Sequence, residues 1–404
     1  MLRKGVIGLI AAVGLCLGGM VPLHAQQVTV GKGDTLSIHG FISGTWFWDR
    51  NQFGGFGQGQ SAEWAAAPGA SFQTDKWFSD AEVSNTRLTL AFAGPHVSEN
   101  WRVKAEIEAD FFGGAGAPPF GDEQPHPRLR LGFADITNGR TTLRIGQFWS
   151  PLFGEYPQSL SHIAFPMGYG SAGFVGWRFP GIFLYQDLSP AGASTKAQLQ
   201  LAAMKGSGPA VGPSGIGNGE ASAIPQFEAR LNVGGKAGGV GWHWYAAGHV
   251  DKKDLSGAGD TTTVGTDTTG TTGWALETGG GIEPGSFVLH GNFYYGQAIG
   301  QQFGAITQFG DIRSWGAWGQ IGYKVPDTGW SLWGYYGIDN PDETRYFQDT
   351  GQNLTRLKNQ VASFMIRYET GPYAVGLEWF KAFTDYQTAQ TKADQIALSV
   401  KYNI

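Results

Sequence analysis

The sequence is poor in cysteine, in long apolar runs and in charge. Its single cysteine, Cys16, lies in an N-terminal segment that we expect to be removed, which excludes disulfides and thiolate metal sites from the mature chain. After that segment, no apolar run approaches the roughly 20 residues of a helical membrane span. Charged residues are only 15% of the chain, and removal of Arg3 and Lys4 from the 28 basic residues leaves 26 against 33 acidic ones. The resulting net charge of −7 argues against non-specific binding of nucleic acid.

The first 25 residues have the organisation of a secretory signal peptide. Arg3 and Lys4 precede an apolar stretch from about Val6 to Leu17, and Ala25 offers a small residue for cleavage. A membrane anchor, the alternative, would need a longer apolar stretch followed by basic residues. We therefore expect cleavage after Ala25 and a mature chain of residues 26–404 that forms one domain.

The stretch from Trp101 to Gly113 has the clearest pattern in the chain. Alternate residues are apolar (Trp101, Val103, Ala105, Ile107, Ala109, Phe111) or charged (Arg102, Lys104, Glu106, Glu108, Asp110). Because successive residues of a β-strand point to opposite faces, this strand has one apolar and one charged face. A soluble sandwich could use such a strand with its apolar face inward. Five successive charges on one face favour the reverse, with the apolar face toward lipid and the charged face toward a wet interior.

Similar segments recur along the whole chain and predict sixteen strands. They cover residues 35–49, 83–92, 101–113, 128–136, 141–148, 176–188, 195–204, 224–233, 239–250, 272–282, 286–297, 313–325, 330–339, 357–369, 373–383 and 394–404. Their connections alternate between long and short, as in bacterial outer-membrane barrels, and only a closed sheet can cross lipid. We predict an all-β fold, a 16-stranded antiparallel transmembrane β-barrel.

Several short motifs follow one another along the chain: His39-Gly40-Phe41-Ile42, Asn85-Thr86-Arg87-Leu88-Thr89-Leu90, Ile107-Glu108-Ala109-Asp110-Phe111-Phe112-Gly113, Arg130-Leu131-Gly132-Phe133 and Arg144-Ile145-Gly146-Gln147. Taken in order, they resemble the Gram-negative outer-membrane porins, in particular the trimeric dicarboxylate-type porins with sixteen strands. The resemblance implies a homotrimer in the outer membrane and passive diffusion of small hydrophilic solutes. The chain departs from the family pattern at its last residue, which is Ile404 where porins usually have Phe.

The resemblance also implies that the third external loop, from Trp149 to Val175, folds into the barrel and narrows it. The loop is rich in glycine, proline and aromatic residues, which supply bends and apolar area for packing on the wall. We take Phe153, Glu155, Tyr156, His162 and Tyr169 as its constriction residues. The alternatives are a loop that packs at a trimer interface or that covers the barrel mouth. The glycines at 168, 170 and 173 match a dinucleotide-binding pattern by letter only, because no strand and helix flank them.

With the apolar faces outward, a row of basic residues points into the lumen: Arg87, Arg102, Lys104, Arg128, Arg130, Arg144 and Arg178. The lumen-facing acids are Glu106, Glu108 and Asp110. Cations beside a narrow gap favour anions, and guanidinium groups bind carboxylates with two hydrogen bonds. The interpretation is therefore a channel that favours anions or small carboxylates. The alternative is that Arg87 and Arg130 form structural ion pairs with the three acids, and both can hold at once.

Two further features each have two interpretations. Tyr294, Trp318, Trp333 and Tyr335 could offer a stacking path for sugars, or could belong to aromatic girdles and barrel wall. The connection 251–271 could hold a cation through Asp254, Asp260 and Asp267, but it lacks the spacing of a calcium loop and is more typical of a solvated loop. We expect no cofactor and no resident metal.

Two other function classes remain open. An outer-membrane barrel enzyme, phospholipase- or protease-like, would need a catalytic group that sequence motifs do not reveal, since triads assemble in space. A structural barrel or adhesin would not conduct. We favour a porin that is not an enzyme, with outer-membrane lipid, other copies of itself and small hydrophilic or anionic solutes as partners.

Overall fold

A computed structural model describes residues 26–29, 34–55, 59–70, 73–114, 125–209, 215–254, 270–342 and 356–404. The expected signal peptide with Cys16 lies outside these residues, and so do Asp260 and Asp267. Within them, no helix is long and apolar enough to cross a membrane.

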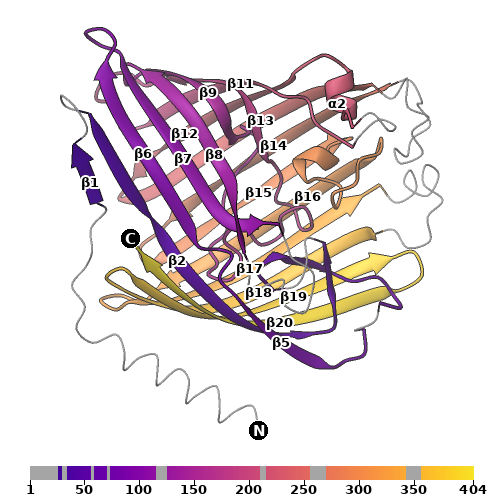
Figure 1. Ribbon diagram of the computed structural model, residues 1–404. Coiled ribbons are helices and arrows are strands. Elements are labelled where there is room, and N and C mark those ends of the chain that lie inside the picture. The colour runs from indigo at the N-terminus through magenta and orange to yellow at the C-terminus, as the bar shows by residue number, and fades with distance from the viewer. Residues whose placement is uncertain are drawn as a thin grey trace.

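The chain forms a closed antiparallel β-barrel with sixteen strand positions (Figure 1). The strands are β1 (Gln26–Thr29), β2 (Thr35–Arg50), β3 (Phe53–Gly55), β4 (Ala62–Ala65), β5 (Trp77–Glu82), β6 (Arg87–His96), β7 (Arg102–Gly113), β8 (His126–Thr137), β9 (Thr141–Trp149), β10 (Arg178–Asp187), β11 (Lys196–Met204), β12 (Gln226–Ala237), β13 (Val240–Asp254), β14 (Gly270–Glu283), β15 (Phe287–Gln297), β16 (Arg313–Lys324), β17 (Trp330–Pro341), β18 (Arg356–Thr370), β19 (Tyr373–Tyr386) and β20 (Gln390–Asn403). Short helices are η1 (Gly59–Ser61), α2 (Asn218–Ala221) and η3 (Gly300–Gln302). Pairing of β2 with β20 closes the sheet. β1 pairs with the first residues of β2, β3 and β4 form a separate hairpin, and β5 and β6 share one position, which leaves sixteen positions around the barrel. The predicted fold class and strand number are therefore confirmed.

The second barrel position differs from its prediction because two strands share it. β5 pairs with one end of β2 and β6 with the other, and residues 83–86 interrupt them. The sequence analysis assigned residues 50–81 to a loop, which was wrong for residues 77–81, since they belong to β5. The same expected loop contains the β3–β4 hairpin. Neither segment has a long alternating pattern, so periodicity could not reveal them.

A β-bulge reverses the alternation inside β8. The register with β7 shifts between Glu108 and Ala109, so that Arg130 is an extra residue on β8. Leu131 is buried and Phe133 packs on Arg144, whereas the predicted alternation placed both on the apolar face. A bulge inserts one unpaired residue and changes which face the following side chains take. Arg128 and Arg130 thereby stay on the same face as Asp135.

The two faces of the barrel differ in chemistry. The outward face carries exposed aliphatic and aromatic side chains such as Ile107, Trp244, Leu276 and Ile321. The residues between them, which we call the polar face, are mostly buried and include many acids, amides and hydroxyls. Aromatic pairs border the outward face near the short connections, for example Trp330–Tyr368 and Tyr373–Tyr402, whose ring centroids are 4.9 and 4.8 Å apart. This distribution agrees with aromatic girdles at membrane surfaces.

Candidate functional site

Residues 150–177, which connect β9 to β10, contact the polar face of strands far apart around the barrel. The Leu152 amide donates to Glu228 Oε2 on β12 (2.7 Å), and the Gln158 amide donates to Gln320 Oε1 on β16 (2.7 Å). Ser161 is tied to two further positions, because its hydroxyl donates to Glu378 Oε2 on β19 and its carbonyl accepts from Asn85 Nδ2. We call this connection the crossing segment.

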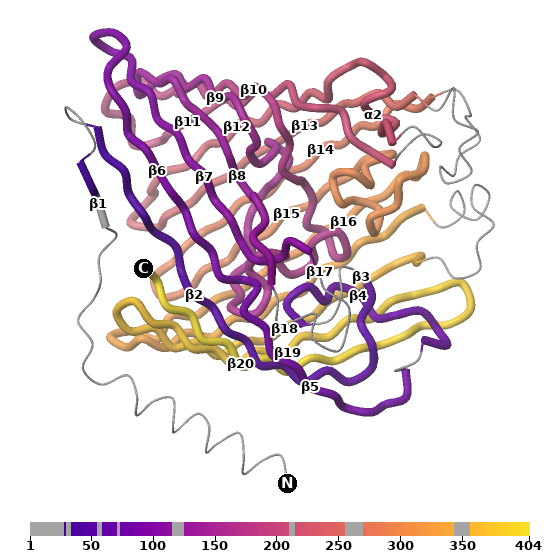
Figure 2. The backbone as a smooth tube through the Cα atoms, viewed as in Figure 1, coloured from indigo at the N-terminus to yellow at the C-terminus, as the bar shows by residue number. Residues whose placement is uncertain are grey.

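Two other long connections pack against the crossing segment. In residues 51–70, the carbonyl of Ala62 contacts His162 Nε2 at 3.0 Å, and the carboxylate of Glu63 accepts from the Ser171 hydroxyl at 3.0 Å. In residues 298–312, the Gln302 carbonyl accepts from the Gly176 amide at 2.7 Å. Figure 2 shows the β3–β4 hairpin folded back near β18 and β19, which β4 contacts. The sequence analysis singled out only the crossing segment.

The glycines of the crossing segment permit its close approach to the wall. Gly168, Gly170 and Gly173 have φ angles of +75°, +70° and +88°, which glycine adopts without strain. A Cβ on Gly173 would lie 2.5 Å from backbone atoms of Ala317 on β16. The letter match to a dinucleotide motif therefore has a packing explanation.

An aromatic cluster joins the crossing segment to the wall. The rings of Trp318 and Tyr335 are stacked at 5.6 Å, and Phe174 meets Trp318 edge-on at 6.2 Å. Tyr169 stacks on Phe303 of the neighbouring connection at 4.6 Å. The four residues considered for a sugar path, Tyr294, Trp318, Trp333 and Tyr335, are all buried. They lie on the polar face under the connections, so they are neither girdle residues nor a free stacking surface.

Two acids and three arginines from β6, β7 and β8 form a network of ion pairs. Arg128 Nη2 lies 2.7 Å from Asp110 Oδ2. Arg130 reaches both acids, with Nε 2.7 Å from Glu108 Oε1 and Nη1 2.9 Å from Asp110 Oδ2. Arg87 Nε is 3.8 Å from Glu108 Oε1, but among the described residues its Nε and Nη2 atoms have no hydrogen-bond partner. The bulge at Arg130 makes this convergence possible.

Arg178 adds a further positive charge to the network. Its side chain is buried, with 5% exposure, against the rings of Trp177 and Trp149, at 4.3 and 5.0 Å from the ring centroids. The positive charges of Arg130 and Arg128 repel that of Arg178. In the described part of the chain, the Nε and Nη1 atoms of Arg178 have no hydrogen-bond partner. Four arginines therefore accompany two acids. We call Arg87, Arg128, Arg130, Arg178, Glu108 and Asp110 the arginine cluster.

The other predicted polar-face residues lie apart from this cluster. Arg144 forms two hydrogen bonds with Asp135, of 2.7 and 2.8 Å, between the rings of Phe133 and Phe148. Arg102 and Lys104 are exposed near the other end of β7, and Glu106 is partly buried between them and the cluster. Arg144 is therefore already neutralised, while Arg102 and Lys104 are the most accessible cations of the set.

Of the predicted constriction residues, Phe153, Tyr156 and Tyr169 belong to the aromatic packing. Phe153 stacks on Trp149 at 3.7 Å, and the Tyr156 hydroxyl donates to the carbonyl of Ile163. His162 is buried, with its ring stacked on Phe380 at 4.6 Å. Burial lowers the pKa of His162, against the opposing effect of Glu378, so the neutral ring is favoured.

Glu155 is held by two histidines of the wall. His243 Nε2 lies 2.6 Å from Glu155 Oε2, and His290 Nδ1 lies 3.1 Å from Oε1. Burial alone would raise the pKa of Glu155, but the hydrogen bonds and charges of His290 and His243 hold it below its ordinary value. These histidines carried no motif, and only their placement on the polar face, on either side of Gly281 of β14, reveals them. Within the described residues no group of three or more His, Cys, Asp or Glu is placed to hold a metal ion.

The Glu155 contacts predict a change in acid stability. Because its pKa is depressed, the stabilisation by Glu155 is complete above the ordinary glutamate pKa of about 4.3 and is lost as the pH falls through the lower folded value. In a His290→Leu variant the pKa of Glu155 should rise, so this stabilisation should be lost at a higher pH. Thermal denaturation from about pH 7 to about pH 3 measures the shift. His96→Leu, which changes an exposed turn, is the control, and identical acid profiles for the two variants would contradict the prediction.

Comparisons with known proteins show which solved structures share this fold. No family model and no curated protein matches the chain. Among solved structures, the outer membrane channel DcaP of Acinetobacter baumannii is similar with a TM-score of 0.70 and 18% identity over 93% of this chain and 99% of that one. The anion-selective porin from Comamonas acidovorans has a TM-score of 0.56 and 10% identity, over 92% and 100%. Salmonella typhi OmpF, solved with daunomycin, has a TM-score of 0.57 and 13% identity, over 94% and 100%. The chain has the sixteen-stranded β-barrel fold of the outer-membrane porins.

Proposed function

We propose that the protein is a passive diffusion channel of the Gram-negative outer membrane that favours anions, including small carboxylates. The observation that carries this proposal is the arginine cluster, in which, among the described residues, four arginines lie beside two acids. The excess positive charge would favour anions in the adjacent part of the lumen. The fold supports conduction, because a closed barrel of this size encloses more space than its own side chains fill.

The crossing segment would set the size limit of the channel. Its contacts with Glu228, Gln320 and Glu378 span β12 to β19, which fits a segment that lies across the interior and narrows it. The connections 51–70 and 298–312 pack against it and would narrow the interior further. Selection would then depend on the bore and on charge, with no covalent step.

Recording of single channels in planar bilayers under a potassium chloride gradient tests the function. We expect discrete conductance steps and a reversal potential displaced toward the chloride equilibrium value. A displacement toward potassium would overturn the anion preference and leave the channel intact. Absence of conductance, together with hydrolysis of phospholipid or peptide by the purified protein, would support the barrel enzyme instead.

We further propose that the protein is a homotrimer whose contacts involve the outward face of β6–β9. In the described part of the chain, the strongly exposed large apolar residues between Trp77 and Phe227 are all aliphatic. Elsewhere the outward face carries exposed tryptophan, tyrosine and phenylalanine. Aromatic side chains favour the membrane–water boundary, so an outward face whose strongly exposed apolar residues are aliphatic is better suited to contact with protein than with lipid headgroups.

A bulky substitution on this face should prevent assembly. Ile107 on β7 and Ile321 on β16 are similarly exposed, at 54% and 49%. We expect Ile107→Trp to yield monomers, because overpacking at a close interface costs about 1–3 kcal/mol per site, while Ile321→Trp should remain trimeric. Light scattering with detergent correction measures the mass. Trimers from both variants would place the interface elsewhere.

A further inference from the structure

A cavity of about 290 Å³ lies on the polar face, beside the crossing segment. Glu155 and Gln158 of that segment line it, together with Glu283, Lys324 and Glu369 at the short-connection ends of β14, β16 and β18. In the membrane orientation proposed above, on which this inference rests, these strand ends face the periplasm. We call it the mixed-charge cavity.

Two of the acids in this cavity are already paired. Glu155 is held by the two histidines described above. Glu369 forms an ion pair with Arg367, whose Nη1 also donates to Gln158 Oε1 at 3.3 Å. Arg367 is 9% exposed, and among the described residues its Nε atom has no hydrogen-bond partner. One donor of a buried guanidinium group thus remains unused at the cavity.

Glu283 and Lys324 are the charged residues of the cavity that remain without a partner. Both are exposed, and in the described part of the chain neither side chain forms an ion pair or a hydrogen bond. They belong to β14 and β16, which flank β15. Because neighbouring strands are about 4.8 Å apart, these two strands are separated by roughly 10 Å. The cavity therefore offers one unpaired charge of each sign, on either side of β15.

Apolar side chains lie between these two charges. Val288 of β15 packs against a buried cluster that contains Trp333. In the register Val288 pairs with Gly322 of β16, which in turn pairs with Trp333 of β17. The Trp333 ring covers Gly322, since a Cβ at this position would overlap with ring atoms. A solute that reaches both charges therefore also contacts an apolar surface.

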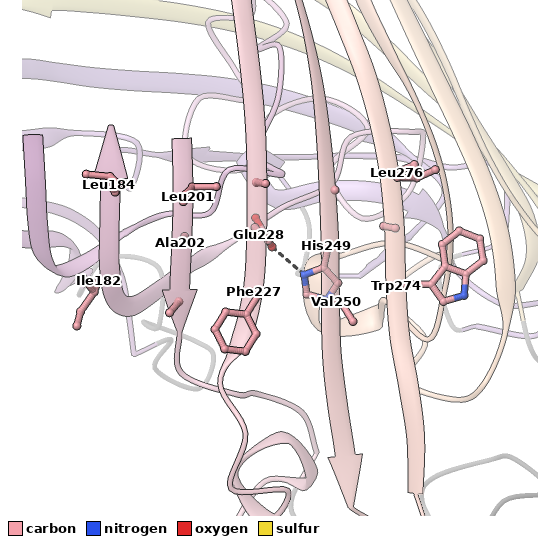
Figure 3. A pocket seen from close by; sticks show the side chains of 14 residues that line it. Ile182, Leu184, Leu201, Ala202, Phe227, Glu228, His249, Val250, Trp274 and Leu276 are labelled. Atoms are coloured by element: carbon pink, nitrogen blue, oxygen red, sulfur yellow. Dashed lines mark hydrogen bonds and ion pairs between the residues drawn. The ribbon is translucent and has the colours of Figure 1, made fainter. Parts of the chain in front are cut away.

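A hollow on the outward face shows what the mixed-charge cavity adds (Figure 3). It has a volume of about 700 Å³ and lies across β10–β14, among side chains such as Leu201, Phe227 and Leu276. Its two ionisable lining residues, Glu228 and His249, are buried on the polar face and contact each other there at 2.9 Å. Within that lining no charge remains for a solute, so apolar contact alone gives no selection by charge.

We propose that the mixed-charge cavity binds a small amino carboxylate whose two charged groups are separated by a short methylene chain. The ammonium group pairs with Glu283 and the carboxylate with Lys324, while the methylene groups contact Val288. Hydrogen bonds between ionised groups are the stronger ones, and each apolar group removed from water adds to binding. Arg367, two strands from Lys324 in the same row of the register, adds positive charge on the carboxylate side.

This site differs from the arginine cluster in position and in ligand. The cluster lies on β6–β8 and β10 and has an excess of positive charge, which favours anions. In the mixed-charge cavity, a carboxylate without an ammonium group leaves Glu283 unpaired. An amine without a carboxylate leaves Lys324 unpaired. The cavity thus selects solutes that carry both charges.

Three substitutions test the two charges. Glu283→Gln and Lys324→Gln each remove one charge and keep a polar side chain of similar length. Both positions are exposed at strand ends, so the variants are expected to fold. Lys236→Gln is the matched control, because Lys236 is exposed on the polar face at the short-connection end of β12 but does not line the cavity.

The experiment measures binding of γ-aminobutyrate, butyrate and butylammonium to the purified protein in detergent micelles, by NMR titration of each ligand. We expect the wild type and Lys236→Gln to bind γ-aminobutyrate about fivefold more tightly than either singly charged ligand, which is the upper range for one exposed ion pair. In Glu283→Gln, γ-aminobutyrate should bind no more tightly than butyrate. In Lys324→Gln, it should bind no more tightly than butylammonium.

Equal affinity of the wild type for the three ligands would overturn the proposal, and so would a preference that survives in either Glu283→Gln or Lys324→Gln. Equal loss in Lys324→Gln and Lys236→Gln would also overturn it, since the general charge at this end of the barrel would then be the cause. Conductance of the same preparation in planar bilayers reports on the proposed function separately. Preferential binding without conductance would reject the channel and keep the site, whereas conductance without preferential binding would reject the site alone.

Discussion

Replacement of Glu378 by leucine is expected to release the crossing segment from β19. Single-channel conductance should then rise by roughly twofold or more, because a barrel of this size is wide enough for an aqueous channel once the segment no longer narrows it. Glu378 is buried and accepts hydrogen bonds from the Ser159 and Ser161 hydroxyls, both at 2.7 Å, and from the Ser161 amide at 3.4 Å. A hydrogen bond to a charged group contributes about 1.5–3 kcal/mol. Loss of these three hydrogen bonds together should detach residues 159–161 of the crossing segment from β19.

The matched control for this variant is Glu283→Leu. Glu283 lies at the short-connection end of β14 and lines a cavity that Glu155 also lines, so its removal takes away the same formal charge from a more exposed position. It makes no hydrogen bond to the crossing segment in the described part of the chain. Glu378→Gln, which retains an acceptor oxygen, should give an intermediate conductance. Equal effects of Glu378→Leu and Glu283→Leu would show that charge, rather than attachment of the segment, limits the current.

Replacement of Arg178 by glutamine is expected to lower the anion-to-cation permeability ratio by about tenfold. This is the order of magnitude expected when one unit charge is removed at short range from the permeating ion, in surroundings of intermediate dielectric constant. Arg178 is the cation of the cluster that has no acidic partner among the described residues. Arg130, by contrast, is shared between Glu108 and Asp110, so its removal would leave two buried acids uncompensated and disturb folding. Reversal potentials in a potassium chloride gradient measure the ratio.

Arg102→Gln serves as the control for Arg178. Arg102 carries the same charge on the polar face, but it is exposed at the other end of β7, where salt screens it. Its removal should change the ratio by less than threefold. A larger effect of Arg102→Gln than of Arg178→Gln would assign the selectivity to the barrel mouth.

The structural ion pairs that the sequence analysis considered for Arg87 and Arg130 are present in part. Arg130 pairs with Glu108 and Asp110, whereas Arg87 Nε lies 3.8 Å from Glu108 Oε1, and Arg128 also pairs with Asp110. The anion interpretation of the remaining cations stays a proposal. Arg144 was grouped with the free cations, but its two hydrogen bonds with Asp135 neutralise it. Asp135 was not considered as a partner, because the bulge in β8 changes which residues of that strand share a face with Arg144.

The sequence by itself determined the barrel, because a strand places alternate residues on opposite faces and a closed sheet needs one apolar face along every strand. Trp101–Gly113 and the last strand could be predicted from that periodicity alone. Only the tertiary structure decided which connections pack against the polar face. The contacts that hold residues 51–70, such as Gln395 with the carbonyl of Gly59, join residues that are 336 positions apart. Side-chain partners at such separations leave no local pattern, so ion pairing, the bulge at Arg130 and the packing of three connections depend on the folded chain.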